Sequence, residues 1–187
     1  MPVLTVLNTH ESSGAAGTVR RMGSRIEHRA EFSAGLAAVV AAVSGEEALL
    51  ARLEELGGDN AKLLSYTADD SGARFELQHG INASRLPQAV RALHKGDLIV
   101  RRTEDWRPDG DGYAGRIDVN VSGVPGEITA RTSLKPDGER VRYRTEGEVT
   151  VRIPLFGGKI ESVVAEQVTT LLRREAEFTA RWLAEHA

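Results

Sequence analysis

"VRIPLFGGKIESVVAEQV", residues 151–168, joins a strand pattern to a helix pattern without a linker. A phosphate-binding loop would need G-x-x-x-x-G-K-[ST], but Lys159 is followed by Ile160 and lacks an earlier glycine at the right spacing. We therefore interpret Gly157-Gly158-Lys159 as a hinge that turns the chain into a helix, with Pro154 ending the strand. An acidic headgroup held by Lys159 at the helix N-terminus is the alternative.

The helix after this hinge is expected to start near Phe156 or Gly158 and to run to about Ala184. At about 1.5 Å per residue it spans roughly 40 Å, enough to cross a whole sheet. Its apolar stripe is expected to face that sheet: Ile160, Val163, Val164, Val168, Leu171, Leu172, Phe178 and Leu183. Four charged residues are assigned mostly to its outer side: Arg173, Arg174, Glu175 and Glu177.

Most of the remaining chain alternates with period two, which predicts half-buried strands. The first strand, "SRIEHRAEF" (24–32), places Ile26 and Phe32 on one face. Two short helices follow: "AGLAAVVAAVS" (34–44), which Ser33 can cap, and "GEEALLARLEELGG" (45–58). About six further strands come next, separated by turns such as Asp70-Ser71-Gly72, with a short helix inserted in "SRLPQAVRALHKG" (84–96).

This element order predicts an α+β fold in which one long helix covers a curved antiparallel sheet of about seven strands. Only the C-terminal helix is long enough to cover the apolar face of so many strands. A curved sheet wrapped round one helix leaves a space between them. The two short helices after the first strand are expected to plug one end of that space.

The composition limits the partners. A formal net charge of −3 gives no support for a nucleic-acid partner. The absence of cysteine excludes disulfides and fits a cytoplasmic location. No apolar run approaches the roughly 20 residues of a membrane span, so no integral membrane association is expected. We expect a disordered N-terminal extension over residues 1–22, with Met22 as the alternative start, and a single domain over residues 23–187.

Three segments carry a family resemblance: "GDLIVRRTEDW" (96–106), "VPGEITARTSLKP" (124–136) and "VRIPLFGGKIE…LLRREAEFTARWL" (151–183). With the element order, they resemble the helix-grip, or START-like (SRPBCC), superfamily, which includes polyketide cyclases, lipid-transfer START domains and Bet v allergens. The segments are most similar to an uncharacterised actinobacterial family of START-like proteins, over about Gly23 to Ala187. The resemblance implies a hydrophobic cavity and assigns no reaction.

The candidate cavity residues share the inner face by parity. Most of them are apolar or aromatic: Phe75, Leu77, Trp106, Ile117, Val119, Ile128, Leu134 and Tyr143 from the strands, with Val164, Val168, Leu171 and the polar Gln167 from the helix. Inward polar residues complete the set: His79, Arg102, Glu104 and Thr132. The same parity also fits a core that is simply filled.

Arg102 and Glu104 have two interpretations, because a charge on a buried face must be paired or lie beside water or ligand. A bulge or strand end would return them to solvent, whereas a buried pair would orient a ligand's polar end.

Arg140, Arg142 and Arg144 form an outward stripe that Glu127 and Glu146 can pair with across strands. Signatures of catalysis and metal binding are thin, so no catalytic residue, metal or cofactor is assigned.

Three functions fit these patterns. The favoured hypothesis is binding or transport of a small hydrophobic molecule, lipid or polyketide-like, with entry through motion of residues 81–94 or of the two early helices. The second is a cyclase- or hydrolase-type enzyme on the same fold, using His79, Glu104 or Tyr143 as acid or base. The third is an interaction module whose core is fully packed and whose protein partner is unknown.

Overall fold

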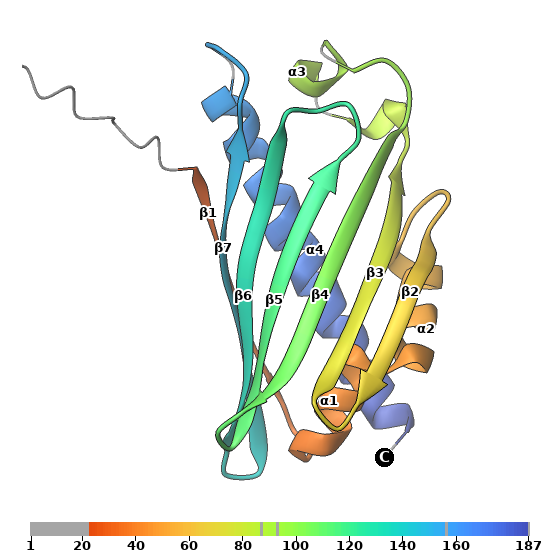
Figure 1. Cartoon of the computed structure of the whole chain (residues 1–187), viewed down its shortest axis with the longest axis vertical. Coiled ribbons are helices and arrows are strands. Elements are labelled where there is room, and N and C mark those ends of the chain that lie inside the picture. Colours follow the sequence, from red (N-terminus) through yellow and green to blue (C-terminus); the bar gives the residue numbers. More distant parts are fainter. Residues whose placement is uncertain (1–22, 87, 93, 156, 187) are drawn as a thin grey trace, which may run out of the picture.

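The computed structural model describes residues 23–86, 88–92, 94–155 and 157–186 (Figure 1). The predicted N-terminal extension, residues 1–22, lies outside the described residues. Seven strands form one antiparallel sheet: β1 (Ser24–Phe32), β2 (Lys62–Asp69), β3 (Gly72–Ile81), β4 (Leu98–Asp109), β5 (Gly112–Val121), β6 (Gly126–Asp137) and β7 (Arg140–Val151). Their order across the sheet is β1-β7-β6-β5-β4-β3-β2, so β2 to β7 form a meander and β1 is added at its far edge.

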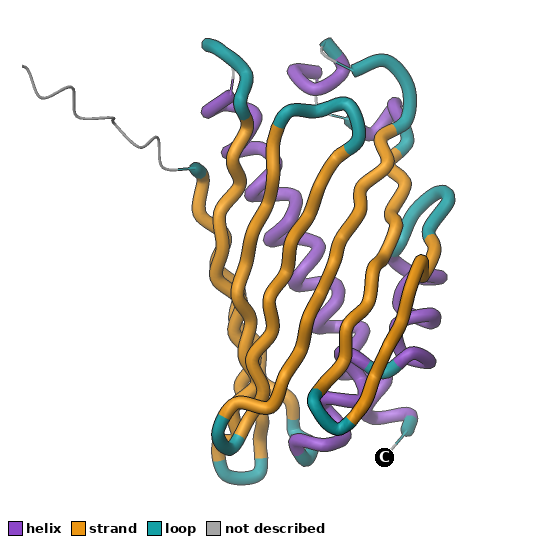
Figure 2. The backbone as a smooth tube through the Cα atoms, viewed as in Figure 1, coloured by secondary structure: helices purple, strands orange, loops and turns teal. Residues whose placement is uncertain are grey.

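The helices agree with the predicted order. They are α1 (Leu36–Ser44), α2 (Glu46–Leu56), the 3₁₀ turn η1 (Ala83–Arg85), α3 (Gln88–Arg91) and the long α4 (Gly157–Glu185). Helix α4 runs diagonally across one face of the curved sheet and packs mainly on β1 and β7 (Figure 1, Figure 2). The predicted helix-grip architecture, with two short helices after the first strand, is therefore confirmed.

Alternation along the strands determines which face is buried. In β1 the side chains of Ile26 and Phe32 are buried. Between them, partly buried residues alternate with exposed residues. Because side chains point to opposite faces at successive positions, one shift of register would expose the whole buried set. The face turned away from α4 carries ion pairs between neighbouring strands, including Arg140 with Glu31 at 2.9 Å and Arg142 with Asp137 at 3.2 Å.

Two details of this outer face differ from expectation. Glu146 pairs with Arg144 along the same strand rather than across strands, and Glu127 pairs with Arg152 rather than with a member of the arginine stripe. Each arginine of the stripe pairs with a carboxylate two residues away or on the adjacent strand. The stripe is therefore a set of exposed, local ion pairs. Pairs of this kind contribute at most about 1 kcal/mol each.

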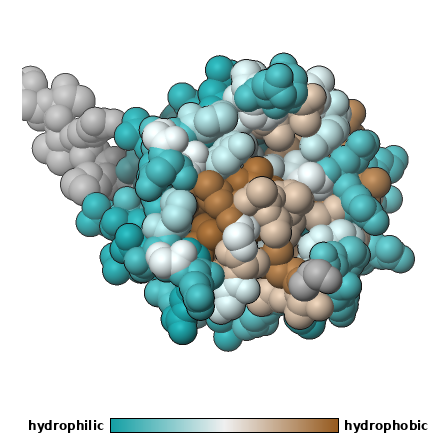
Figure 3. Space-filling model, turned by 90° about the horizontal axis from the view of Figure 1, so that it is seen from below, coloured by the Kyte–Doolittle hydropathy of each residue, from teal (hydrophilic) through white to brown (hydrophobic). Residues whose placement is uncertain are grey.

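Helices α1 and α2 fill the lower end of the space between the sheet and α4 (Figure 1). The predicted cap at Ser33 is wrong: α1 begins after Gly35, which makes no side-chain cap bond. The segment LAAVVAAVS carries no charge, so its outer side adds an apolar area to the lower end of the molecule (Figure 3). Gly57 follows the last residue of α2, and Leu50 of this helix is 50% exposed.

The predicted hinge between β7 and α4 lies where the sequence placed it, but a different residue makes the turn. Helix α4 begins at Gly157, six residues after Val151 ends the strand. The left-handed backbone conformation lies at Leu155, with φ of 68°, rather than at a glycine. In the first turns of α4, the carboxylate of Glu161 accepts a hydrogen bond from the backbone N–H of Val151 at 2.8 Å, which ties the helix to the strand end.

Candidate functional site

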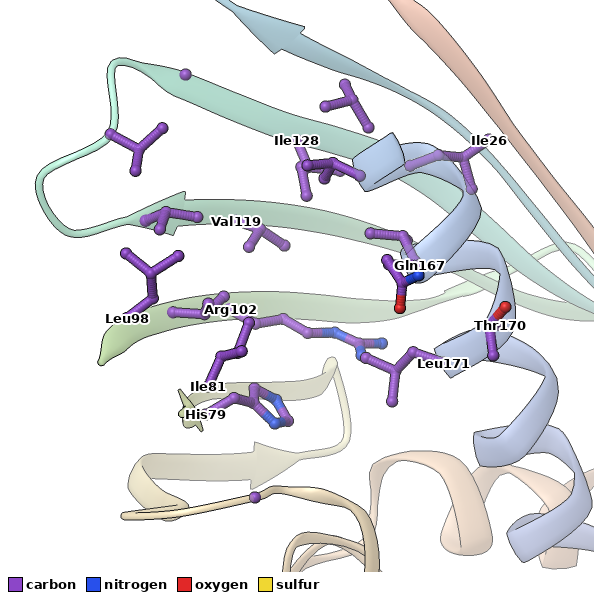
Figure 4. Close-up of a pocket in the computed structure, with 18 of the residues that line it drawn as sticks. Ile26, His79, Ile81, Leu98, Arg102, Val119, Ile128, Gln167, Thr170 and Leu171 are labelled. Atoms are coloured by element: carbon purple, nitrogen blue, oxygen red, sulfur yellow. The ribbon is translucent and has the colours of Figure 1, made fainter. Parts of the chain in front are cut away.

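A cavity of about 520 Å³ lies between α4 and the upper half of the sheet, the half that carries α3 (Figure 4). Strands β3 to β7 and α4 supply most of its wall, and the segment between β3 and β4 closes its upper end. Most of the wall is aliphatic: Ile26, Ile81, Leu86, Val90, Leu98, Val100, Ile117, Val119, Val121, Ile128, Val149, Val151, Ile160, Val164, Val168, Leu171 and Leu172.

Nine of the sequence-predicted residues lie in this wall. They come from the middle of the strands and from the middle of α4: His79, Arg102, Ile117, Val119, Ile128, Val164, Gln167, Val168 and Leu171. The other predicted residues have the expected inward side chains but lie nearer the lower end: Phe75, Leu77, Glu104, Trp106, Thr132, Leu134 and Tyr143. There α1 and α2 fill the space, so these side chains belong to a packed core and not to the cavity wall.

Sequence reasoning missed part of the wall. Val100, Val121 and Val149 have the same parity as the predicted set, so extending each strand toward its upper end would have found them. Ile81 ends β3 with the same parity as His79, so it could have been found in the same way. Leu86 and Val90 come from an irregular segment and a short helix, where no periodicity marks the inner face.

Two arginines and two glutamates form a buried charge cluster at the lower end of the cavity: Arg52 of α2, Arg102 and Glu104 of β4, and Glu175 of α4. The guanidinium of Arg102 donates from Nη1 to both carboxylate oxygens of Glu175, at 2.8 and 3.0 Å. Its Nε lies 2.8 Å from Oε1 of Glu104. Arg52 lies 3.9 Å from Glu104 and 3.8 Å from Glu175.

The cluster corrects one assignment and decides another. Glu175 is buried against the sheet, although the sequence assigned it to the outer side of the helix. Arg102 and Glu104 are 6% and 2% exposed, so they do not return to solvent at a bulge or strand end. Glu104 also accepts a hydrogen bond from Trp106 Nε1 at 2.8 Å. Burial of these groups is compatible with full charge because each carboxylate has an arginine partner.

The protonation states in the cluster follow from these contacts. Burial alone would raise the pKa of Glu175, but the charges of Arg102 and Arg52 outweigh it and lower that pKa to about 2. Burial opposes the charge of Arg102 too, and Glu104 and Glu175 together raise its pKa. Both residues are therefore ionised at neutral pH.

His79 lies in the cavity wall beside this cluster, on the strand next to Arg102 (Figure 4). Burial, together with the positive charge of Arg102, lowers the pKa of His79 to about 4, so its imidazole is neutral at pH 7. Its Nε2 atom is buried and has no hydrogen-bond partner among the described residues.

The other two acid–base candidates lie away from the cavity. The carboxylate of Glu104 is held by Arg102 and Trp106, and the ring of Tyr143 packs near Phe32 at a centroid distance of 6.2 Å. Burial raises the pKa of Tyr143, so its phenol is neutral. Of the three proposed acids and bases, only His79 can meet a molecule in the cavity.

The exposed residues of the cavity wall gather mainly in two facing segments. Gly58 and Asp59 follow α2, while Gln167, Thr170 and Arg174 lie on one side of α4. We infer that the cavity opens to solvent between these segments. Its mouth is lateral, between the helix and the loop after α2.

Over the part of the chain that the structure describes, no three histidine or acidic side chains gather as a metal site would require. Within the same residues, no helix is long and apolar enough to cross a membrane.

Structural comparison shows the fold. The chain superposes on a START superfamily protein from Mycobacterium smegmatis with a TM-score of 0.56 and 13% identity, covering 86% of this chain and 99% of that one. Norcoclaurine synthase from Thalictrum flavum, solved in complex with dopamine and hydroxybenzaldehyde, gives a TM-score of 0.53 and 15% identity, covering 100% of this chain and 99% of that one. The expected START-like, helix-grip fold is thus confirmed.

Sequence comparison shows the family. The uncharacterized protein Rv0481c of Mycobacterium tuberculosis (strain ATCC 25618 / H37Rv) is 33% identical over 144 residues, which cover 73% of this chain and 83% of that protein. A family described as "Protein of unknown function (DUF2505)" matches residues 27–183. The chain is therefore a member of the DUF2505 family, built on the START-like fold.

Proposed function

We propose that the protein binds a small hydrophobic molecule in the cavity between the sheet and α4. One observation carries the proposal: a cavity of about 520 Å³ whose wall is mainly aliphatic, with a few polar groups at one end. Pockets that bind small molecules have volumes of about 300–1,000 Å³ and the same apolar character. Protein cores normally contain few voids larger than a water molecule, so a space of this size is not ordinary packing.

Burial of the ligand's apolar surface would supply the affinity, at about 25 cal/mol per Å² before the costs of association. The aliphatic wall offers no charge along most of its length, which suits a lipid or a polyketide-like ring. The lateral mouth gives a route of entry, which motion of residues 81–94 or of the two early helices would widen. A cytoplasmic location is part of this proposal.

Two alternatives are less well supported. An interaction module with a fully packed core has less support, because a cavity of about 520 Å³ lies beside the packed lower core. An enzyme of the cyclase or hydrolase type would need ionisable groups in contact with the bound molecule, and of its three candidates only His79 lies in the wall.

Fluorescence titration with N-phenyl-1-naphthylamine, an uncharged apolar probe, tests the proposal. We expect the wild type to bind the probe saturably. Val119→Trp and Val168→Trp should bind it much more weakly, because their indoles would fill the cavity from the sheet and from α4. Asn120→Trp is the matched control, because the adjacent side chain is exposed on the opposite face of β5. Equal binding by all four proteins would show that the probe does not enter this cavity.

A further inference from the structure

The buried charge cluster contains two arginines and two glutamates, so its charges cancel. All four side chains are at most 7% exposed, and each has an opposite charge no farther away than 3.9 Å. His79, beside the cluster, is neutral at pH 7. The lower end of the cavity is therefore polar but carries no net charge.

A charged ligand group would gain little at this end. A carboxylate would have to displace Glu104 or Glu175 from Arg102, or remain near both of them without a cation of its own. An ammonium would face Arg52 and Arg102, whose carboxylate partners Glu104 and Glu175 are already paired. Either group would lose its hydration, and separating a buried ion pair leaves a charge that is buried and uncompensated.

An uncharged oxygen, in contrast, finds partners without disturbing the cluster. The contacts of Arg102 with Glu104 and Glu175 use Nε and Nη1, and an arginine has two further N–H donors on Nη2. Nε2 of His79 is buried and without a partner among the described residues, and a neutral imidazole nitrogen can accept from a hydroxyl or donate to a carbonyl. A buried polar atom that stays unpaired costs free energy, which a hydrogen bond to a ligand oxygen would recover.

We propose that the cavity selects ligands that carry an uncharged oxygen at one end, as in an alcohol or a ketone, and disfavours carboxylates and amines of the same chain length. The oxygen lies between His79 and Arg102, and the hydrocarbon part extends along the aliphatic wall toward the upper end of the cavity. This inference rests on the proposed function and names the class of ligand.

Displacement of bound N-phenyl-1-naphthylamine at pH 7.5 by four ten-carbon competitors tests it: decan-1-ol, 2-decanone, decanoate and decylamine. We expect the alcohol and the ketone to displace the probe at concentrations about tenfold lower than the two ions, or lower still. Displacement by decanoate or decylamine as readily as by decan-1-ol would overturn the proposal.

Two variants test the residues involved. In His79→Phe, with each displacement referred to the affinity of this variant for the probe, the advantage of decan-1-ol over decanoate should fall by about fivefold because one hydrogen-bonding partner is lost. Glu175→Gln leaves the cluster with one net positive charge, so the concentration of decanoate that displaces the probe should fall relative to that of decan-1-ol. Decanoate should also raise the melting temperature of this variant more than that of the wild type. If Glu175→Gln does not fold, the His79→Phe result decides.

The two proposals fail differently. If the probe binds the wild type and Val119→Trp blocks it, but the alcohol has no advantage or His79→Phe retains all of it, only the ligand class is wrong. If the probe never enters the cavity, both proposals fall.

Discussion

Replacing Glu175 by glutamine removes the negative charge that α4 contributes to the buried charge cluster. The lowered pKa of Glu175 gives the magnitude. A fall from an ordinary value of 4.5 to about 2 corresponds to about 3 kcal/mol of stability at neutral pH, at about 1.36 kcal/mol for each pH unit. Breaking a buried ion pair from one side typically destabilises by about 3–5 kcal/mol, which agrees in size.

Urea unfolding at pH 7, followed by circular dichroism, measures this loss. We expect Glu175→Gln to lower the free energy of unfolding by about 3 kcal/mol. The control is Glu177→Gln, because Glu177 is exposed on the same helix. This control should change the free energy of unfolding by less than about 0.5 kcal/mol. Equal stability of the wild type and Glu175→Gln would refute the view that the cluster holds α4 on the sheet.

The pH dependence gives an independent check. Because the folded-state pKa of Glu175 is depressed, its stabilising contribution is complete above about pH 4.5 and is lost as the pH falls toward 2. The stability difference between the wild type and Glu175→Gln should therefore shrink over this interval. A difference that stays constant from pH 6 to pH 3 would mean that the carboxylate is not held in its ionised form.

Two further substitutions test the packing around the site, both measured by urea unfolding. Leu134 is 0% exposed in the lower core. Leu134→Ala should lower the free energy of unfolding by about 2–5 kcal/mol, and a loss below about 1 kcal/mol would contradict the packed core. A Cβ added at Gly80 would lie 1.5 Å from the carbonyl oxygen of Asp59. Gly80→Ala should therefore cost about 1–3 kcal/mol. Gly35→Ser is its control, because a Cβ at Gly35 would meet no atom within 4 Å. This control should stay within about 0.5 kcal/mol of the wild type.

The sheet was predictable because its pattern is local. Alternation in β1 or β7 depends only on neighbouring residues, and the glycine-containing turns between strands mark where each run ends. The length of α4 also follows from local spacing. These features determine the order of elements, and only one long helix was available to cover the sheet.

The burial of Glu175 was not predictable from residue type. Its polar neighbours Arg173, Arg174 and Glu177 favoured the outer side, while its partners Arg52 and Arg102 lie far away in the sequence. Position alone gave a hint, because residue 175 follows Leu172 by three and precedes Phe178 by three on the buried side. An acidic residue at such a spacing indicates a buried partner elsewhere in the chain.

The extent of the cavity could not be predicted from the alternation of residues along the strands. Alternation assigns Leu77 and Val119 to the same face, but it does not give their height along the sheet relative to α1 and α2. Leu77 lies where these helices fill the space, and Val119 lies above them. The boundary between the packed core and the cavity therefore depends on where α1 and α2 pack. The residue pattern of the strands does not give this position.

The anchoring of α4 explains why the space above that boundary does not collapse. Glu161 binds the end of β7 through the backbone N–H of Val151, and Glu175 binds Arg102 from the sheet. About four turns of helix, roughly 21 Å, lie between these two carboxylates. Val164 and Val168 lie in this stretch and face the cavity. A helix held by buried polar contacts at both ends cannot move toward the sheet in its middle without bending or breaking one of them. These two carboxylates therefore hold α4 at both ends of the stretch that faces the cavity.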